Sequence, residues 1–130
     1  MDERHETQPS STDRERLELA LAQITEDAHL YDEAVASYNI HLENHRERRD
    51  LHDLPLRQPI TDDETFQRGI DGDRESLERV LSTLLDRIHF DSAVRRHPRV
   101  FPIHLEAVEH LDIARDRLVR AIEDALRHPA

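Results

Sequence analysis

The 130-residue chain contains no cysteine and no tryptophan, and it has only two glycines. The absence of cysteine excludes disulfide frameworks, thiolate zinc sites and cysteine nucleophiles, and it favours a cytoplasmic location. Aromatic residues make up only 4% of the chain. With so few glycines and aromatic rings, we expect neither a glycine-rich phosphate loop nor a stacking platform for nucleic-acid bases.

Long apolar stretches are also absent, since no run of about 18 apolar residues occurs. The start of the chain, MDERHETQPS, is polar and charged, and no apolar run follows it. We therefore expect neither a signal peptide nor contact with a membrane. Residues 1–11 lack apolar side chains after Met1 and contain Pro9, so we expect them to form a disordered tail.

Positive charge is the scarcer sign, because 18 basic residues, all of them arginine, stand against 29 acidic ones. The formal net charge at pH 7 is −11. The one dense basic cluster, RERR at residues 46–49, has acidic residues close on both sides. An acidic surface is repelled by phosphate backbones, and we therefore expect no nucleic-acid partner.

One stripe of apolar residues, here called the seam, dominates the N-terminal third of the chain. Its members recur at alternating steps of four and three: Leu17, Leu21, Ile24, Ala28, Tyr31, Val35, Tyr38 and Leu42. Steps that average about 3.5 residues place all of them on one face of a helix, as in a coiled coil or helical bundle. The pattern predicts a helix from about residue 13 to about residue 50.

The rest of the chain predicts shorter helices and connections. Residues 51–60 contain two prolines and form a connection, residues 61–69 form a short helix, and residues 74–89 and 102–127 form two further main helices. Apolar residues after position 89 leave the helical register, so a bend near Asp91 or a separate short helix to His97 is expected. Pro102 suits the first position of the last helix.

These elements predict an all-α fold. It is a helical bundle of three main helices, one of them the long N-terminal helix, plus one or two short helices. Residues 12–130 are expected to form a single all-helical domain, because a chain of 130 residues suffices for one hydrophobic core. No alternating apolar pattern predicts a strand.

The first predicted helix is much longer than the second, so part of its seam has no cover within one chain. We therefore expect a homodimer in which the two long helices pair. The predicted interface residues are Leu17, Leu21, Ile24, Tyr31, Val35, Tyr38 and Leu42. The alternative is a monomer whose long helix breaks near residues 36–40 and folds back on itself.

Ten histidines form the most visible set of possible metal ligands. His41 and His45 are four residues apart, a spacing that lets two imidazoles on one helical face meet one metal ion. Glu26 and His29 are three residues apart, as in the carboxylate-histidine pairs of di-iron bundles. A divalent metal site at these four residues is therefore an alternative to a protein without a cofactor.

Two pairs of glutamates give a second pattern, Glu75 with Glu78 and Glu106 with Glu109. Carboxylate pairs on neighbouring helices can hold Mg²⁺ for phosphate chemistry. The arrangement is loosely similar to that of the all-helical MazG-type nucleotide pyrophosphohydrolases, and the resemblance covers these four positions. The second pair of that family ends in Asp, where this chain has Glu109.

The sequence thus favours a non-enzymatic helical-bundle interaction or scaffold protein. Such a protein acts through self-association and contacts with other proteins, whose identity the sequence does not give. The alternative is a carboxylate-histidine metal-binding bundle, which the resemblance extends to metal-dependent phosphate or nucleotide hydrolysis.

Overall fold

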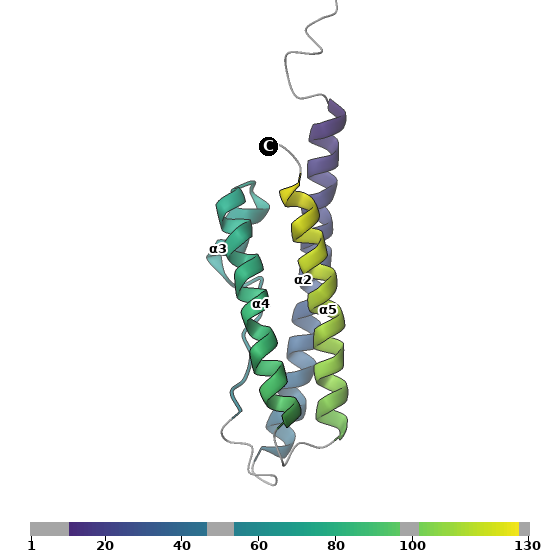
Figure 1. Cartoon of the computed structure of the whole chain (residues 1–130), viewed down its shortest axis with the longest axis vertical. Coiled ribbons are helices and arrows are strands. Elements are labelled where there is room, and N and C mark those ends of the chain that lie inside the picture. Colours follow the sequence, from purple (N-terminus) through teal and green to yellow (C-terminus); the bar gives the residue numbers. More distant parts are fainter. Residues whose placement is uncertain (1–10, 47–53, 97–101, 128–130) are drawn as a thin grey trace, which may run out of the picture.

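The structure, a computed structural model, describes residues 11–46, 54–96 and 102–127. Over these residues it contains four helices and no strand: α2 (Ser11–His45), α3 (Glu64–Ile70), α4 (Arg74–Arg96) and α5 (Pro102–Leu126) (Figure 1). The predicted all-α bundle with three main helices, a long N-terminal helix and a short helix is confirmed. Residues 1–10 of the predicted tail lie outside the described residues. Ser11, the last residue of that predicted tail, belongs to α2.

The axes of the three long helices are roughly aligned (Figure 1). Helices α2 and α5 form the most extensive contact and run in opposite directions, and α4 packs against α5. The short helix α3 lies beside the start of α4. The first turns of α2 extend past the end of α5. None of the described helices has the length and apolar character needed to cross a membrane.

The seam of α2 is buried within the single chain. Its central members Ile24, Ala28, Tyr31, Val35, Tyr38 and Leu42 are at most 1% exposed, and they share one core with buried residues of α4 and α5. Only Leu17 and Leu21, near the start of the helix, are partly exposed. The helix is also continuous across residues 36–40. Cover for most of the seam therefore comes from the same chain, without a break in α2 and without a second copy.

Residues 54–61, here called the strap, lie along α2 and run in the direction opposite to that helix. The backbone of the strap is held by Arg46, which directly follows α2, and then by side chains of α2 in descending order of residue number. Arg46 Nη2 donates to the carbonyl oxygen of Leu54 at 3.0 Å. Asn39 both accepts from the amide of Arg57 at 2.8 Å and donates to its carbonyl oxygen at 2.9 Å. The amide side chain of Asn39 thus pairs with the strap as a neighbouring backbone would.

Asp32 fixes the end of the strap. Its carboxylate accepts hydrogen bonds from the amide of Ile60 at 2.7 Å and from the amide and hydroxyl of Thr61 at 3.2 and 2.5 Å. Three donors on one carboxylate satisfy backbone groups that have no partner in a helix or sheet. Ile60 is thereby held in the core, where it is 1% exposed.

The short helix and its neighbour begin at aspartates. Asp63 is the N-cap of α3, and its side chain accepts from the amide of Thr65 at 2.9 Å. Asp73 directly precedes α4, and its carboxylate accepts from the hydroxyl of Ser76 at 2.6 Å. Gly72 joins the two helices with a φ of 111°, a conformation that suits glycine. The prediction that Pro102 begins the last helix is confirmed.

Helix α4 differs from its prediction. It continues without interruption to Arg96, so the prediction of a bend near Asp91 or of a separate short helix is wrong. The core positions of this helix are Leu77, Val80, Leu84, Asp91 and Val94, all at most 2% exposed. The apolar register seemed to end because the buried residue at position 91 is an aspartate.

Candidate interaction surface

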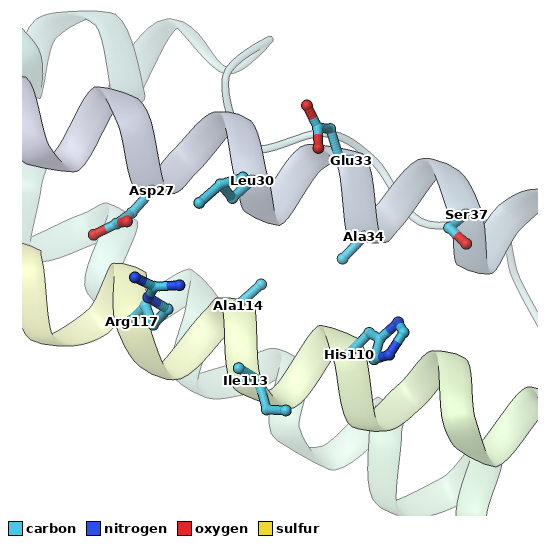
Figure 2. Close-up of a pocket in the computed structure, with 9 residues that line it drawn as sticks. All are labelled: Asp27, Leu30, Glu33, Ala34, Ser37, His110, Ile113, Ala114 and Arg117. Atoms are coloured by element: carbon cyan, nitrogen blue, oxygen red, sulfur yellow. The ribbon is translucent and has the colours of Figure 1, made fainter.

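An open groove of about 340 Å³ runs between α2 and α5 (Figure 2). Its apolar residues are Leu30 and Ala34 of α2 and Ile113 and Ala114 of α5. Leu30 is 41% exposed and Ile113 is 62% exposed, so both present large apolar surfaces to solvent. All residues that line this α2/α5 groove come from these two helices, and the strap and α4 contribute none.

Helical spacing explains why the groove forms. Asp27, Leu30, Ala34 and Ser37 follow one another at steps of three and four, so they form a second stripe beside the seam. On α5, His110, Ile113 or Ala114, and Arg117 repeat the same spacing. Each helix therefore has an apolar strip next to the face that it buries against its neighbour.

The two edges of the α2/α5 groove differ in charge. The α2 edge carries the exposed Glu33, and the α5 edge carries the exposed residues Arg117 and His110 (Figure 2). Asp27 of α2 is only 5% exposed and points toward Arg117 of the same chain (Figure 2). Among the residues that the structure describes, none of these four side chains forms a hydrogen bond or an ion pair. Glu33 and Arg117 are exposed and can therefore contribute charge to a contact with another molecule.

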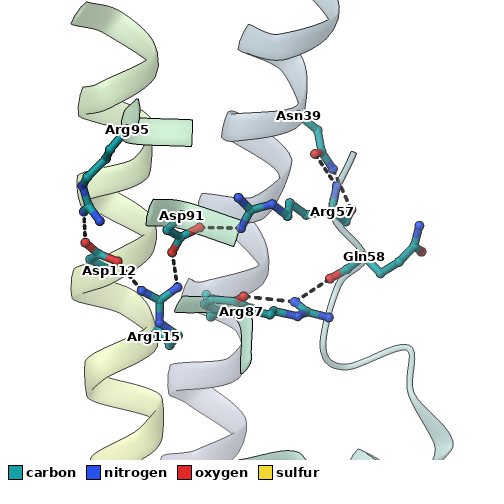
Figure 3. Close-up of polar contacts among 9 residues, drawn as sticks. Asn39, Arg57, Gln58, Arg87, Asp91, Arg95, Asp112 and Arg115 are labelled. Carbon is teal, nitrogen blue, oxygen red and sulfur yellow. Dashed lines mark hydrogen bonds and ion pairs between the residues drawn. The ribbon is translucent and has the colours of Figure 1, made fainter. Parts of the chain in front are cut away.

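A second hollow, of about 360 Å³, lies between α4 and α5. Its exposed or marginally buried apolar residues are Leu85, Ile88 and Val119. The charged groups beside them already pair with one another, because Asp112 accepts from both Arg95 and Arg115 (Figure 3). With its charges satisfied within the chain, this surface has less to offer a partner than the α2/α5 groove.

A charged network is buried where the strap meets α4 and α5 (Figure 3). Asp91 is fully buried, and its two carboxylate oxygens accept from Arg57 Nη1 at 2.6 Å and from Arg115. Arg57 also lies over the ring of Tyr38, with its guanidinium carbon 4.7 Å from the ring centre. Burial disfavours the charged form of Arg115, but the hydrogen bond and charge of Asp91 outweigh it and raise the pKa of Arg115. The network joins three elements of the fold and does not open onto the groove.

The two tyrosines of the seam differ in how their hydroxyl groups are satisfied. Tyr31 accepts a hydrogen bond from Arg87 Nη1 at 3.0 Å, and this arginine also donates to the carbonyl oxygen of Gln58 at 2.9 Å. The hydroxyl of Tyr38 is buried without a hydrogen-bond partner in the described structure. Burial raises the pKa of Tyr38, despite the opposing charge of nearby Arg57. Both side chains therefore act as parts of the core.

The four residues predicted as metal ligands do not meet. Glu26 and His29 are exposed on α2, and Glu26 accepts a hydrogen bond from Gln23 at 3.5 Å. His41 and His45 are partly buried near the other end of the same helix. At 1.5 Å per residue, the two pairs are roughly 20 Å apart along α2. Over the described residues, no group of three or more metal-ligating side chains is positioned to hold an ion.

The paired glutamates are also separated. All four are exposed, and Glu75 forms an ion pair at 3.7 Å with Arg79 of its own helix. Glu75 and Glu78 lie near the start of α4, whereas Glu106 and Glu109 lie near the start of α5. Since α4 and α5 run in opposite directions, these starts are at opposite ends of the bundle (Figure 1). The two pairs cannot share a magnesium ion in this fold.

Comparisons of the chain with protein-family models, with curated proteins and with solved structures give no match.

The α2/α5 groove was not predicted from the sequence. The sequence did contain an indication of this groove, because Leu30 and Ile113 are large apolar residues that lie outside the core stripes of their helices. Single apolar residues off a stripe are common on protein surfaces, and only the packing of α2 beside α5 brings these two together.

Proposed function

We propose that this protein is a non-enzymatic helical-bundle interaction protein that acts through self-association, with the α2/α5 groove as the contact surface for a second copy. The groove is the observation that supports this proposal. Leu30 and Ile113 both line it and are exposed, and polar residues line it toward both ends (Figure 2). An apolar floor with a polar rim is the usual composition of a protein interface.

A second copy suits this groove because its two edges carry opposite charge. On the α2 edge Glu33 is exposed and Asp27 is 5% exposed, and on the α5 edge Arg117 and His110 are exposed. A surface with both signs is complementary to itself once a symmetry axis exchanges the edges. The net charge of −11 makes two copies repel elsewhere. Association is therefore expected where acidic and basic edges meet.

The proposal moves the predicted homodimer interface from the seam to the groove. The seam residues fill the core of one chain, so they are not available to a partner in this fold. A groove-mediated dimer leaves that core intact. A cytoplasmic location, and contacts with further protein partners through the remaining surfaces, belong to the same proposal.

The test compares two isoleucines of nearly equal exposure. Ile113 is 62% exposed in the groove, whereas Ile40 is 60% exposed on α2 and does not line it. In sedimentation equilibrium, Ile113→Asp is expected to weaken association at least tenfold, because a carboxylate is then buried against apolar surface. Ile40→Asp is expected to leave association unchanged, and circular dichroism checks that both variants remain helical.

Two results would overturn the proposal. One is a wild-type protein that stays monomeric over the whole concentration range. The other is a dimer that Ile113→Asp does not weaken, and Ile88→Asp then shows whether the surface between α4 and α5 forms the contact instead.

A further inference from the structure

We infer that the two copies are related by a two-fold axis that runs along the α2/α5 groove, so that α2 of each copy packs against α5 of its partner. This inference rests on the proposed function and adds the relative orientation of the copies. The argument uses the order of residues along the groove, the sizes of the apolar side chains and the charges of the two edges.

Residues on the two helices occupy matching levels along the groove (Figure 2). Asp27 and Arg117 lie at one end, Leu30 lies opposite Ala114, and Ser37 and His110 lie toward the other end. A rotation by half a turn about an axis parallel to the groove keeps each residue at its level and exchanges the two sides. The acidic edge of one copy then lies over the basic edge of the other.

This orientation brings an acidic side chain of one copy to the level of an arginine or a histidine of the other at both ends of the contact. The exposed Glu33 comes near His110 of the partner subunit, and the largely buried Asp27 comes to the level of Arg117 of the partner subunit. Each of these contacts occurs twice because of the symmetry. Asp27, Glu33, His110 and Arg117 have no side-chain hydrogen bond or ion pair among the described residues of their own chain, so none has to be broken.

The apolar floor fits the same orientation. Leu30 lies level with Ala114 across the groove (Figure 2). After the rotation, Leu30 of one copy meets Ala114 of the partner subunit, and Ile113 of the partner subunit lies at nearly the same level (Figure 2). Large side chains therefore pack on small ones, as in the interior of a helical bundle. The four central helices α2 and α5 of both copies form a bundle, with each α4 on the outside.

The competing orientation has its two-fold axis across the groove, perpendicular to the helices. It places α2 on α2 and α5 on α5 of the other copy. Asp27 and Glu33 then face an identical acidic edge, and Arg117 faces an identical basic edge. Like charges opposite one another disfavour this pairing, and the net charge of −11 adds to the repulsion.

Site-specific thiol cross-linking separates the two orientations, and the chain has no cysteine of its own to interfere. Leu30→Cys and Ile113→Cys are made as separate chains, one with a removable tag that changes its size. The chains are mixed, allowed to exchange and treated with a short bis-maleimide. A mixture of single variants is used because both thiols on one chain would link within that chain across the groove.

The inferred axis predicts a product that joins one Leu30→Cys chain to one Ile113→Cys chain, in severalfold excess over products of either variant alone. Glu33→Cys with His110→Cys repeats the test on the edges, where the apolar packing is unchanged. Preferential self-linking of each variant, in a protein whose uncross-linked mass is dimeric, would overturn the inferred orientation and leave the proposed function standing. A monomeric mass without cross-links would overturn both.

Discussion

Asp91 shows what a single residue contributes to this fold. It is fully buried on α4 and bridges Arg57 of the strap and Arg115 of α5. The side chains of both arginines are only 6% exposed. Two buried guanidinium groups would repel each other and lose solvation without the carboxylate between them. The bridge therefore neutralises charge that this packing could not otherwise tolerate.

Asp91→Asn is expected to lower the free energy of unfolding by about 3–5 kcal/mol, because it leaves buried cations without their counter-charge. Urea unfolding followed by circular dichroism measures this loss. The matched control is Asp116→Asn, which breaks an exposed ion pair with Arg120 at 3.1 Å on α5. That change is expected to cost less than about 1 kcal/mol. Equal losses for the two variants would show that the buried bridge has no special role.

At the scale of the helix, the start of α4 depends on Asp73. Its carboxylate accepts a hydrogen bond from Ser76, and this bond, assisted by backbone amides of the first turn, lowers the pKa of Asp73 below its ordinary value of 3.8. A carboxylate whose pKa is lower in the folded than in the unfolded state stabilises the fold at pH values above 3.8. That contribution is lost as the pH falls from 3.8 through the lowered pKa.

An NMR titration of the Asp73 carboxyl carbon is expected to give a midpoint below 3.8 in the wild-type protein. Ser76→Ala removes the hydroxyl donor, so the midpoint is expected to move upward toward 3.8. Ser82→Ala, at an exposed serine of the same helix, serves as the control and is expected to leave the midpoint unchanged. If Ser76→Ala and Ser82→Ala behave alike, the hydrogen bond is not the cause of the shift.

The elements also show which parts of the fold follow from sequence patterns. The seam of α2 and the start of α5 at Pro102 were predicted correctly, because uninterrupted helical spacing and proline chemistry are local properties. The continuation of α4 was missed because a buried ion bridge replaces an apolar residue at Asp91, and its arginine partners lie far away in the sequence. Local patterns contain no information about such partners.

The candidate site was harder to predict than the fold for the same reason. A stripe such as the seam shows that a helix face is buried, but it does not show whether the same chain or another copy covers it. Tyr31 and Tyr38 were expected at a dimer interface and lie in the core of one chain. The histidine and glutamate pairs have ligand spacing along a helix, yet a metal site also requires convergence in space, which tertiary packing decides.

At the scale of the whole molecule, a net charge of −11 opposes association of identical chains. The α2/α5 groove overcomes this opposition only if its acidic edge meets the basic edge of the partner. Reversing the charge on one edge should therefore weaken association of the two copies. Reversing the charge on the other edge in the second copy should restore association. Glu33 and His110 are suitable because both are exposed on the groove edges and lie at similar levels along the groove (Figure 2).

Light-scattering mass of Glu33→Arg, of His110→Glu and of their equimolar mixture tests this self-complementary contact most directly. The wild-type protein and the mixture are expected to have about twice the chain mass of 15.3 kDa. His110→Glu alone places two carboxylates together at both symmetry-related contacts, and Glu33→Arg alone removes the acidic member of both. Association should therefore be weakened, about tenfold or more for His110→Glu, and the mass should fall toward 15.3 kDa. Variants that remain as dimeric as the wild type, or a mixture no heavier than its components, would contradict the contact between α2 and α5 of two copies.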